Sequence, residues 1–279
     1  MIPASFGYTR AASLSDAVAA VGGGAKVIAG GQSLLPLMKL RLASPERLID
    51  IGRLAELKGY RHTAEGGVEI GALTTYAEWQ AATDVPEVAA AIDLIADVQV
   101  RNRGTLGGAI AHADPASDAS AIVLAFEGQA VLRGPGGDRV VPLDGFFESA
   151  FQTGMRPDEI LVAIRRGPLR PGTRFAYRKL AQKASGYPIV GIAATVVYDG
   201  RTIGHAAIDV TGVHEHAYRA ENVEKALVGS DGSAAAIAAA AAHVTDDVEV
   251  NSDIHADAQY RAAMAVVYTR RAIEGALGR

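Results

Sequence analysis

The sequence predicts an α+β protein in which two small α/β subdomains precede a C-terminal domain of three antiparallel strands and helices. Helix and strand signals alternate along the first part of the chain, and a Gly- and Pro-rich stretch (GPLRPG, residues 167–172) interrupts them. Three strand-like runs then lead into a helical tail. This grouping of elements indicates the fold class. The 279 residues are enough for two or three modest subdomains.

The composition excludes several classes of function. Hydrophobic residues make up 49% of the chain and charged residues 21%, as in packed globular proteins. The net charge of −4 argues against a large basic surface for nucleic acid. Cysteine is absent, so disulfides, thiolate zinc sites and iron–sulfur clusters held by this chain are ruled out. Because neither a signal peptide nor a run of roughly 20 apolar residues is visible, we expect a cytoplasmic protein without a transmembrane segment.

The first subdomain, residues 1–53, has the pattern of a β-turn-helix-β unit preceded by a helix. Ser13 is a good N-cap for a helix that runs to Val21, where three glycines stop it. A short apolar strand at 26–29 ends at Gly30-Gly31. An apolar segment follows, in which Pro36 is tolerated only near the start of a helix. Residues 47–51 (RLIDI) are expected to form the next strand.

The second subdomain, residues 54–168, combines helices, strands and turn-rich loops. Thr75 and Glu78 form a capping box at the start of one helix. Glycines make residues 101–108 (RNRGTLGG) a turn-rich loop and residues 134–137 (GPGG) a turn. The other expected elements are a strand at 68–71, helices at 87–96 and 117–126, and strands at 129–133 and 159–165.

The C-terminal domain, residues 172–279, begins with strands and ends with helices. The strands are expected at 175–180, 189–197 and 202–210, and Asp199-Gly200 is a hairpin signal between the last two. Helices are expected at 222–228, along the alanine run from Ser233, and at 256–277.

Two glycine-rich turns, about seventy residues apart, are the candidate functional motifs. The first (AGGQSL, residues 29–34) lies between a strand and a helix, where unpaired amides and the helix dipole favour a phosphate. The second is RNRGTLGG. Neither is a GxGxxG or Walker motif, and a Gly-Gly turn after a strand is often purely structural. Together, however, two such turns are able to hold the two phosphates of a dinucleotide.

These motifs resemble a known family. AGGQSLLPLMKLRL (residues 29–42) and VRNRGTLGGAIAHADPASD (residues 100–118) resemble the FAD-binding medium subunit of molybdenum hydroxylases, the carbon monoxide dehydrogenase and xanthine dehydrogenase family. Further similar blocks, among them EILVAI and FAYRKLAQKASGYPIVGIAATV, extend the resemblance over essentially the whole chain. The resemblance implies an FAD-binding fold of the vanillyl-alcohol-oxidase type. In that fold FAD lies between the two N-terminal subdomains and the C-terminal domain closes over the flavin.

The resemblance also implies a set of cofactor-binding residues. The family's first pyrophosphate loop corresponds to Val27, Ile28, Ala29, Gly30, Gly31, Gln32, Ser33 and Leu34, and its second to Thr105, Gly107 and Gly108. Asp118 corresponds to an acidic contact with FAD, Leu161 and Lys179 to residues lining the flavin, and Tyr187 to a tyrosine that covers the flavin face.

Each single residue also has a plain structural explanation. Asp118 suits the first turn of a helix, where the dipole stabilises a carboxylate. Leu161 suits the core, Lys179 an edge strand, and Tyr187 before a proline a simple turn. Arg101 and Arg103 flank the second loop and are expected to position it on the surface rather than to bind phosphate.

The function implied is that of an electron-transfer flavoprotein subunit. FAD is the expected cofactor, whereas a molybdenum cofactor and [2Fe–2S] clusters would lie only on a large and a small partner subunit, assembled as a dimer of heterotrimers. Association of that complex with the inner face of the membrane is compatible with this assignment. An external acceptor takes the electrons, no protein acid or base is needed, and no catalytic residue is assigned.

Two other functions stay open from the sequence. They are a stand-alone flavin oxidoreductase and a non-catalytic nucleotide-binding scaffold. His214, Glu215 and His216 offer metal-binding groups, but residues i and i+2 share a face only on a regular strand, so no metal site is assigned. The substrate of the complex and the acceptor are not visible in the sequence.

Overall fold

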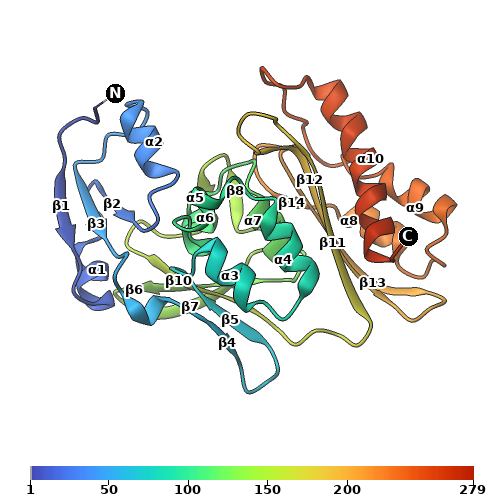
Figure 1. Ribbon diagram of the computed structural model, residues 1–279, viewed down its shortest axis with the longest axis horizontal. Coiled ribbons are helices and arrows are strands. Elements are labelled where there is room, and N and C mark those ends of the chain that lie inside the picture. The colour runs from blue at the N-terminus through green and yellow to red at the C-terminus, as the bar shows by residue number, and fades with distance from the viewer. Residues whose placement is uncertain (1) are drawn as a thin grey trace.

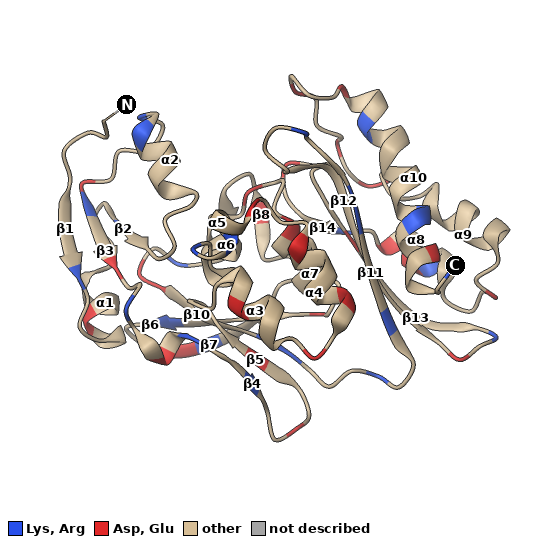
Figure 2. Cartoon of the chain, viewed as in Figure 1, with Lys and Arg blue, Asp and Glu red and all other residues tan. Residues whose placement is uncertain are grey.

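The computed structural model describes residues 2–279, which form three regions in chain order (Figure 1). Each region has its own main β-sheet, of three, five and four strands respectively. The predicted fold class is confirmed, whereas the boundaries 1–53, 54–168 and 172–279 stay a prediction. Lys, Arg, Asp and Glu are scattered over all three regions (Figure 2). Among residues 2–279, no helix has the length and apolar character needed to span a bilayer.

The N-terminal region is a parallel three-stranded sheet with two short helices. Its strand order is β1 (Gly7–Arg10), β3 (Arg47–Asp50) and β2 (Ala25–Ile28). α1 (Leu14–Ala20) begins after Ser13, whose side chain accepts a hydrogen bond from the Asp16 amide, as the N-cap prediction requires. α2 (Leu34–Lys39) follows the first glycine turn and contains Pro36 in its first turn.

The middle region places helices on one face of a five-stranded antiparallel sheet (Figure 1). The strand order is β4 (Tyr60–His62), β5 (Val68–Gly71), β10 (Ile160–Arg166), β6 (Gln129–Gly134) and β7 (Gly137–Pro142). The helices are α3 (Tyr76–Ala82), α4 (Pro86–Asp93), α5 (Val98–Arg101), α6 (Leu106–His112) and α7 (Asp118–Leu124). The predicted capping box of Thr75 and Glu78 is present at α3. A short 3₁₀ helix, η1 (Ala55–Leu57), and a small hairpin of β8 (Phe147–Ser149) and β9 (Gln152–Thr153) complete the region.

The C-terminal region is an antiparallel sheet covered by helices on one face (Figure 1). The strands are β11 (Thr173–Ala181), β12 (Pro188–Tyr198), β13 (Ile203–Thr211) and β14 (Tyr218–Arg219), and the helices are α8 (Glu221–Leu227), α9 (Ala234–Ala241) and α10 (Ala258–Ala276). Ile192 and Val196 of β12 belong to the core shared with these helices, whereas Ala193 belongs to the core of the middle region. Because β12 is buried on both faces, its sequence is nearly continuously apolar.

The structure differs from the sequence prediction in several short elements. The C-terminal sheet has four strands instead of three, because β14 pairs with β13. With only two residues, β14 is too short to show an alternation of apolar and polar residues in the sequence. β1, β4 and β7 were also absent from the prediction. The predicted loop at 101–108 contains the end of α5 and the start of α6, and the side chain of Thr105 caps α6 in spite of the glycines that follow.

Candidate functional site

The first glycine turn lies between β2 and α2 and requires glycine at both positions. Gly31 has a φ of +74°, and a Cβ atom there would lie 2.9 Å from Cδ1 of Leu35. A Cβ atom on Gly30 would lie only 2.0 Å from the carbonyl oxygen of Arg103 and 3.1 Å from Cα of Gly104. The two glycine motifs are therefore in backbone contact, although 70 or more residues separate them in sequence.

This first turn presents a row of backbone amides that the protein does not use. Within residues 2–279, no hydrogen bond engages the amides of Gly30, Gly31, Gln32 and Ser33. Ser33 is the N-cap residue of α2, yet its side chain makes no capping hydrogen bond. Successive free amides at the start of a helix form a concave site for an anion, and the helix dipole adds to it. The residues present therefore suit a phosphate group.

The second glycine motif uses most of its amides to build the protein. The amide of Leu106 donates to Thr74 O at 3.0 Å, and that of Gly107 donates to Ala72 O at 2.9 Å. The amide of Gly108 donates to Oγ1 of Thr105 at 3.1 Å. A Cβ atom on Gly107 would lie 2.4 Å from Cβ of Ala72, so Gly107 is needed for packing.

One backbone amide of the second motif is not used by the described part of the chain. Thr105 is buried, and in the described part of the chain its amide makes no hydrogen bond. Binding of a phosphate by Gly107 and Gly108 themselves stays a prediction. Their visible roles are the packing of Gly107 against Ala72 and the hydrogen bond of the Gly108 amide to the capping side chain of Thr105.

A buried polar cluster lies at the start of α7. The hydroxyl of Tyr177 donates to Oδ1 of Asp118 at 2.6 Å, and Nζ of Lys179 lies 2.9 Å from the same oxygen. The side chains of Asp118 and Lys179 are only 7% and 5% exposed. Burial raises the pKa of Asp118, whereas the ammonium of Lys179 and the hydroxyl of Tyr177 act in the opposite direction. The carboxylate is thus held by two partners on β11, across the boundary between the middle and C-terminal regions.

Lys179 also connects this cluster to the turn that carries Tyr187. Its Nζ donates to the carbonyl oxygen of Gly186 at 2.7 Å. The turn is closed by the Gln182 amide, which donates to Tyr187 O at 2.8 Å, and by the Gly186 amide, which donates to Gln182 O at 2.8 Å. One ammonium therefore anchors both the carboxylate on α7 and the β11–β12 turn.

Tyr187 lies close to this cluster with its ring partly exposed. Its side chain is among the exposed large hydrophobic groups, at 44%. Partial burial raises the pKa of Tyr187, and the carboxyl groups of Asp114 and Asp118 raise it further, which places both charges nearby. An exposed aromatic face beside a buried carboxylate is able to stack on a planar ligand.

The other predicted site residues have less specific surroundings. Val27 and Ile28 lie in β2, with Ala29 directly after it, and all three are half-buried. Leu161 on β10 is 4% exposed and belongs to the core of the middle region, as its structural explanation expects. Arg101 donates to the carbonyl groups of Asp93 and Ile95 at the end of α4, which supports its expected positioning role.

Sequence reasoning missed Tyr177 and the glycine that makes room for it. A Cβ atom on Gly191 would lie 2.4 Å from the Tyr177 hydroxyl oxygen, so β12 must carry glycine where that hydroxyl lies, although the register partner of Gly191 is Lys179. The signal was present in FAYRK, because Tyr177 and Lys179 are two residues apart and point to the same face of a strand. Asp118, the common partner, lies 59 residues away from Tyr177.

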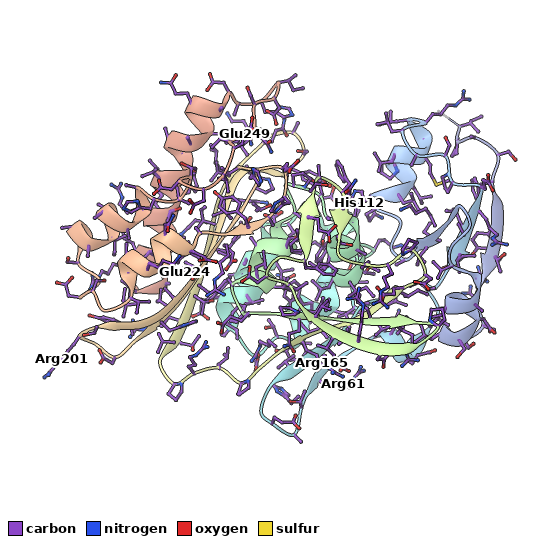
Figure 3. All side chains as sticks on the ribbon, turned by 180° about the vertical axis from the view of Figure 1, so that it is seen from behind. Arg61, His112, Arg165, Arg201, Glu224 and Glu249 are labelled. Atoms are coloured by element: carbon purple, nitrogen blue, oxygen red, sulfur yellow. The ribbon has the colours of Figure 1, made fainter. Side chains whose placement is uncertain are left out.

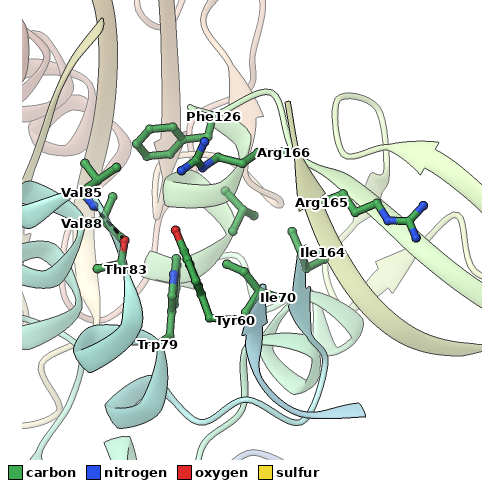
Figure 4. A pocket seen from close by; sticks show the side chains of 12 residues that line it. Tyr60, Ile70, Trp79, Thr83, Val85, Val88, Phe126, Ile164, Arg165 and Arg166 are labelled. Carbon is green, nitrogen blue, oxygen red and sulfur yellow. Dashed lines mark hydrogen bonds between the residues drawn. The ribbon is translucent and has the colours of Figure 1, made fainter. Parts of the chain in front are cut away.

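An apolar cavity in the middle region is separate from this site. It is lined by Tyr60, Trp79, Val88 and Phe126, with Arg166 at one side and Arg165 pointing away (Figure 4). Its volume is about 30 Å³, which leaves room for a few water molecules at most. A dinucleotide does not fit there.

Comparisons with known proteins give a consistent result over the whole chain. A family model described as the FAD binding domain in molybdopterin dehydrogenase matches residues 4–165, and one described as the CO dehydrogenase flavoprotein C-terminal domain matches residues 175–276. The carbon monoxide dehydrogenase medium chain of Hydrogenophaga pseudoflava is 42% identical, over 100% of this chain and 99% of the relative. The glyceraldehyde dehydrogenase medium chain of Sulfolobus acidocaldarius is 35% identical, over 98% and 99%.

Solved structures agree with these relatives. A chain of the Hydrogenophaga pseudoflava carbon monoxide dehydrogenase, in a form that lacks the Mo-pyranopterin moiety of the molybdenum cofactor, superposes with a TM-score of 0.96 at 42% identity, covering 100% of this chain and 99% of that one. A chain of quinoline 2-oxidoreductase from Pseudomonas putida 86 superposes with a TM-score of 0.91 at 30% identity, covering 100% and 99%.

Proposed function

Because the chain belongs to the FAD-binding subunits of the molybdenum hydroxylase family, we propose that it carries electrons from [2Fe–2S] clusters on a partner subunit to an external acceptor. FAD is its cofactor, and it is an oxidoreductase subunit. The observation that carries the proposal is the contact between Gly30 and the Arg103–Gly104 backbone. That contact joins a row of free amides to a second loop.

The residues of this chain bind and orient the cofactor in the proposed site. The amides of Gly30 to Ser33 donate to the pyrophosphate, and the Thr105 amide adds a donor from the second loop. Asp118 accepts a hydrogen bond from the cofactor, and Tyr187 covers a face of the ring system. When bound, FAD supplies one- and two-electron redox chemistry. No side chain is assigned as an acid or base.

The proposed partners are a large subunit with a molybdenum cofactor and a small subunit with [2Fe–2S] clusters, arranged as a dimer of heterotrimers. Several relatives support an assembly, because their names describe medium chains or subunits of complexes. This chain has no cysteine and so cannot hold an iron–sulfur cluster through thiolates. In the proposed complex, electrons therefore reach its flavin from clusters on another polypeptide.

The test is to purify the chain, affinity-tagged, from the cells that produce it and to analyse everything that accompanies it. We expect about one FAD per chain after release by denaturation and chromatography, together with two further polypeptides that contain molybdenum and iron by mass spectrometry. Anaerobic addition of the substrate of the large subunit should bleach the flavin absorption. A chain that is loaded with FAD but has neither partner would support a stand-alone flavin oxidoreductase, and a folded chain that refuses FAD would support a scaffold.

A matched pair of variants connects this test to the geometry. Gly30→Ala should lower the FAD content, because its methyl group would push the two loops apart. Gly204→Ala on β13 serves as the control, because a Cβ atom there meets nothing within 4 Å. Equal FAD contents in the two variants would contradict the placement of the site.

A further inference from the structure

A cluster of three metal-binding side chains lies in the bend between β13 and β14, outside the proposed flavin site. His214, Glu215 and His216 each offer a ligand atom, and these atoms all lie within 4.8 Å of one another. The sequence argued against such a site because i and i+2 residues share a face only on a regular strand. The structure places the three residues in an irregular bend, where that restriction does not apply.

The hydrogen bonds of both imidazoles leave one ring nitrogen free for a metal. Nδ1 of His214 lies 2.6 Å from the carbonyl oxygen of Glu249, and Nδ1 of His216 lies 2.9 Å from that of Ala217. A carbonyl oxygen only accepts, so Nδ1 carries the proton in each ring, and in the neutral imidazole Nε2 then has a free lone pair. A backbone carbonyl bound to the second nitrogen is the usual outer partner of a metal-binding histidine.

The rings are also held in place before any metal binds. The two imidazoles contact each other edge to face, with centroids 4.7 Å apart, and Tyr218 contacts His214 in the same manner at 6.0 Å. Tyr218 is itself fixed by its hydroxyl, which donates to Val244 O at 2.8 Å. Both histidines are half-buried and Glu215 is exposed, so the cluster is ordered on one side and open to solvent on the other.

The geometry points to a site for one divalent transition metal, bound by His214, Glu215 and His216, with Zn²⁺ as its preferred ion. Two imidazoles and one carboxylate are typical of zinc and its neighbours rather than of Mg²⁺ or Ca²⁺, which take mainly oxygen ligands. Three protein ligands leave a fourth position for water.

The position of the cluster indicates a structural role. His214 binds the segment that carries Glu249 (labelled in Figure 3), and the Asn251 amide in the same segment donates to Val213 O at 2.8 Å. On the other side of the bend, the Gly212 amide donates to Pro115 O at 2.8 Å, next to the turn that leads to α7. A bound ion would stiffen the bend that connects these two segments.

The experiment is a calorimetric titration of the full chain, without a polyhistidine tag and after treatment with EDTA, with Zn²⁺. We expect one ion per chain at micromolar concentration. His216→Ala should weaken binding by more than about tenfold. Glu215→Gln removes the charge of an exposed side chain and should weaken binding less. Circular dichroism checks that each variant is folded.

His243→Ala is the matched control. His243 is an exposed histidine that contacts the carboxylate of Asp246, so it offers a histidine and an acid away from the cluster. Its loss should leave the Zn²⁺ affinity unchanged. No saturable binding at micromolar Zn²⁺, or equal loss of affinity in His243→Ala and His216→Ala, would overturn the proposal.

Discussion

Replacement of Gly30 by alanine tests the contact between the two glycine motifs directly. The new Cβ atom would lie 2.0 Å from Arg103 O and 2.9 Å from its carbonyl carbon. Non-bonded atoms of this kind settle near 3.5 Å, so the loops must separate by roughly 1.5 Å. Gly30 does not have a positive φ, so backbone strain at that residue makes no contribution. Overpacking of this size costs about 1–3 kcal/mol.

This cost should appear mainly in cofactor binding. The free protein relieves the clash by moving the first turn away from segment 103–105, whereas a bound pyrophosphate needs both loops together. A penalty of about 1–3 kcal/mol corresponds to FAD binding that is weaker by roughly 5- to 150-fold. The assay is titration of the apoprotein with FAD, followed by quenching of flavin fluorescence, with Gly204→Ala as the control.

Two outcomes would contradict this prediction. If Gly30→Ala binds FAD with the affinity of the unmodified chain, the two loops do not act as one site. If Gly204→Ala loses affinity to the same extent, the effect comes from general destabilisation and not from the contact.

Three further predictions concern single side chains. Burial raises the pKa of Asp209, and neither of its carboxyl oxygens has a hydrogen-bond partner in residues 2–279. At pH 7 the native state therefore holds a proton that the unfolded chain releases, which lowers stability. Asp209→Asn should raise Tm at pH 7 in thermal melts, and this gain should vanish towards about pH 4. The Arg139 guanidinium lowers the pKa of Glu159, so the ionised carboxylate stabilises the native state at pH 7. Glu159→Gln should lower Tm at pH 7, and an equal decrease in Tm at pH 7 and pH 3 would contradict this. Tyr187→Ala should keep FAD bound but shift its reduction potential in spectroelectrochemical titration, and an unchanged potential would count against stacking.

Local patterns in the sequence were sufficient for most of the fold. Ser13 caps α1 and the Thr75–Glu78 box begins α3, because each signal depends only on residues within one helical turn. The sequence did not predict β1, because all four of its residues are exposed and its partner strand, β3, lies 40 residues away in sequence. A strand with no buried face leaves no alternation to detect.

In the candidate site, too, the sequence identifies single residues, whereas contacts between segments distant in sequence are visible only in the structure. The resemblance named Gly30 and Thr105 separately, but only the structure shows the first turn touching Arg103 and Gly104. Likewise, Gly107 was expected to bind phosphate, and its packing against Ala72 depends on a contact between α6 and a different loop. Residue type predicts which groups are able to bind, whereas the distribution of hydrogen bonds decides which amides stay free.

In the proposed site, Lys179 connects the carboxylate of Asp118 to the turn that carries Tyr187. Its ammonium is shared between Oδ1 of Asp118, in the middle region, and the carbonyl oxygen of Gly186, in the C-terminal region. Because Gly186 directly precedes Tyr187, one buried ammonium holds both the carboxylate that is proposed to bind the cofactor and the turn whose tyrosine is proposed to cover the flavin.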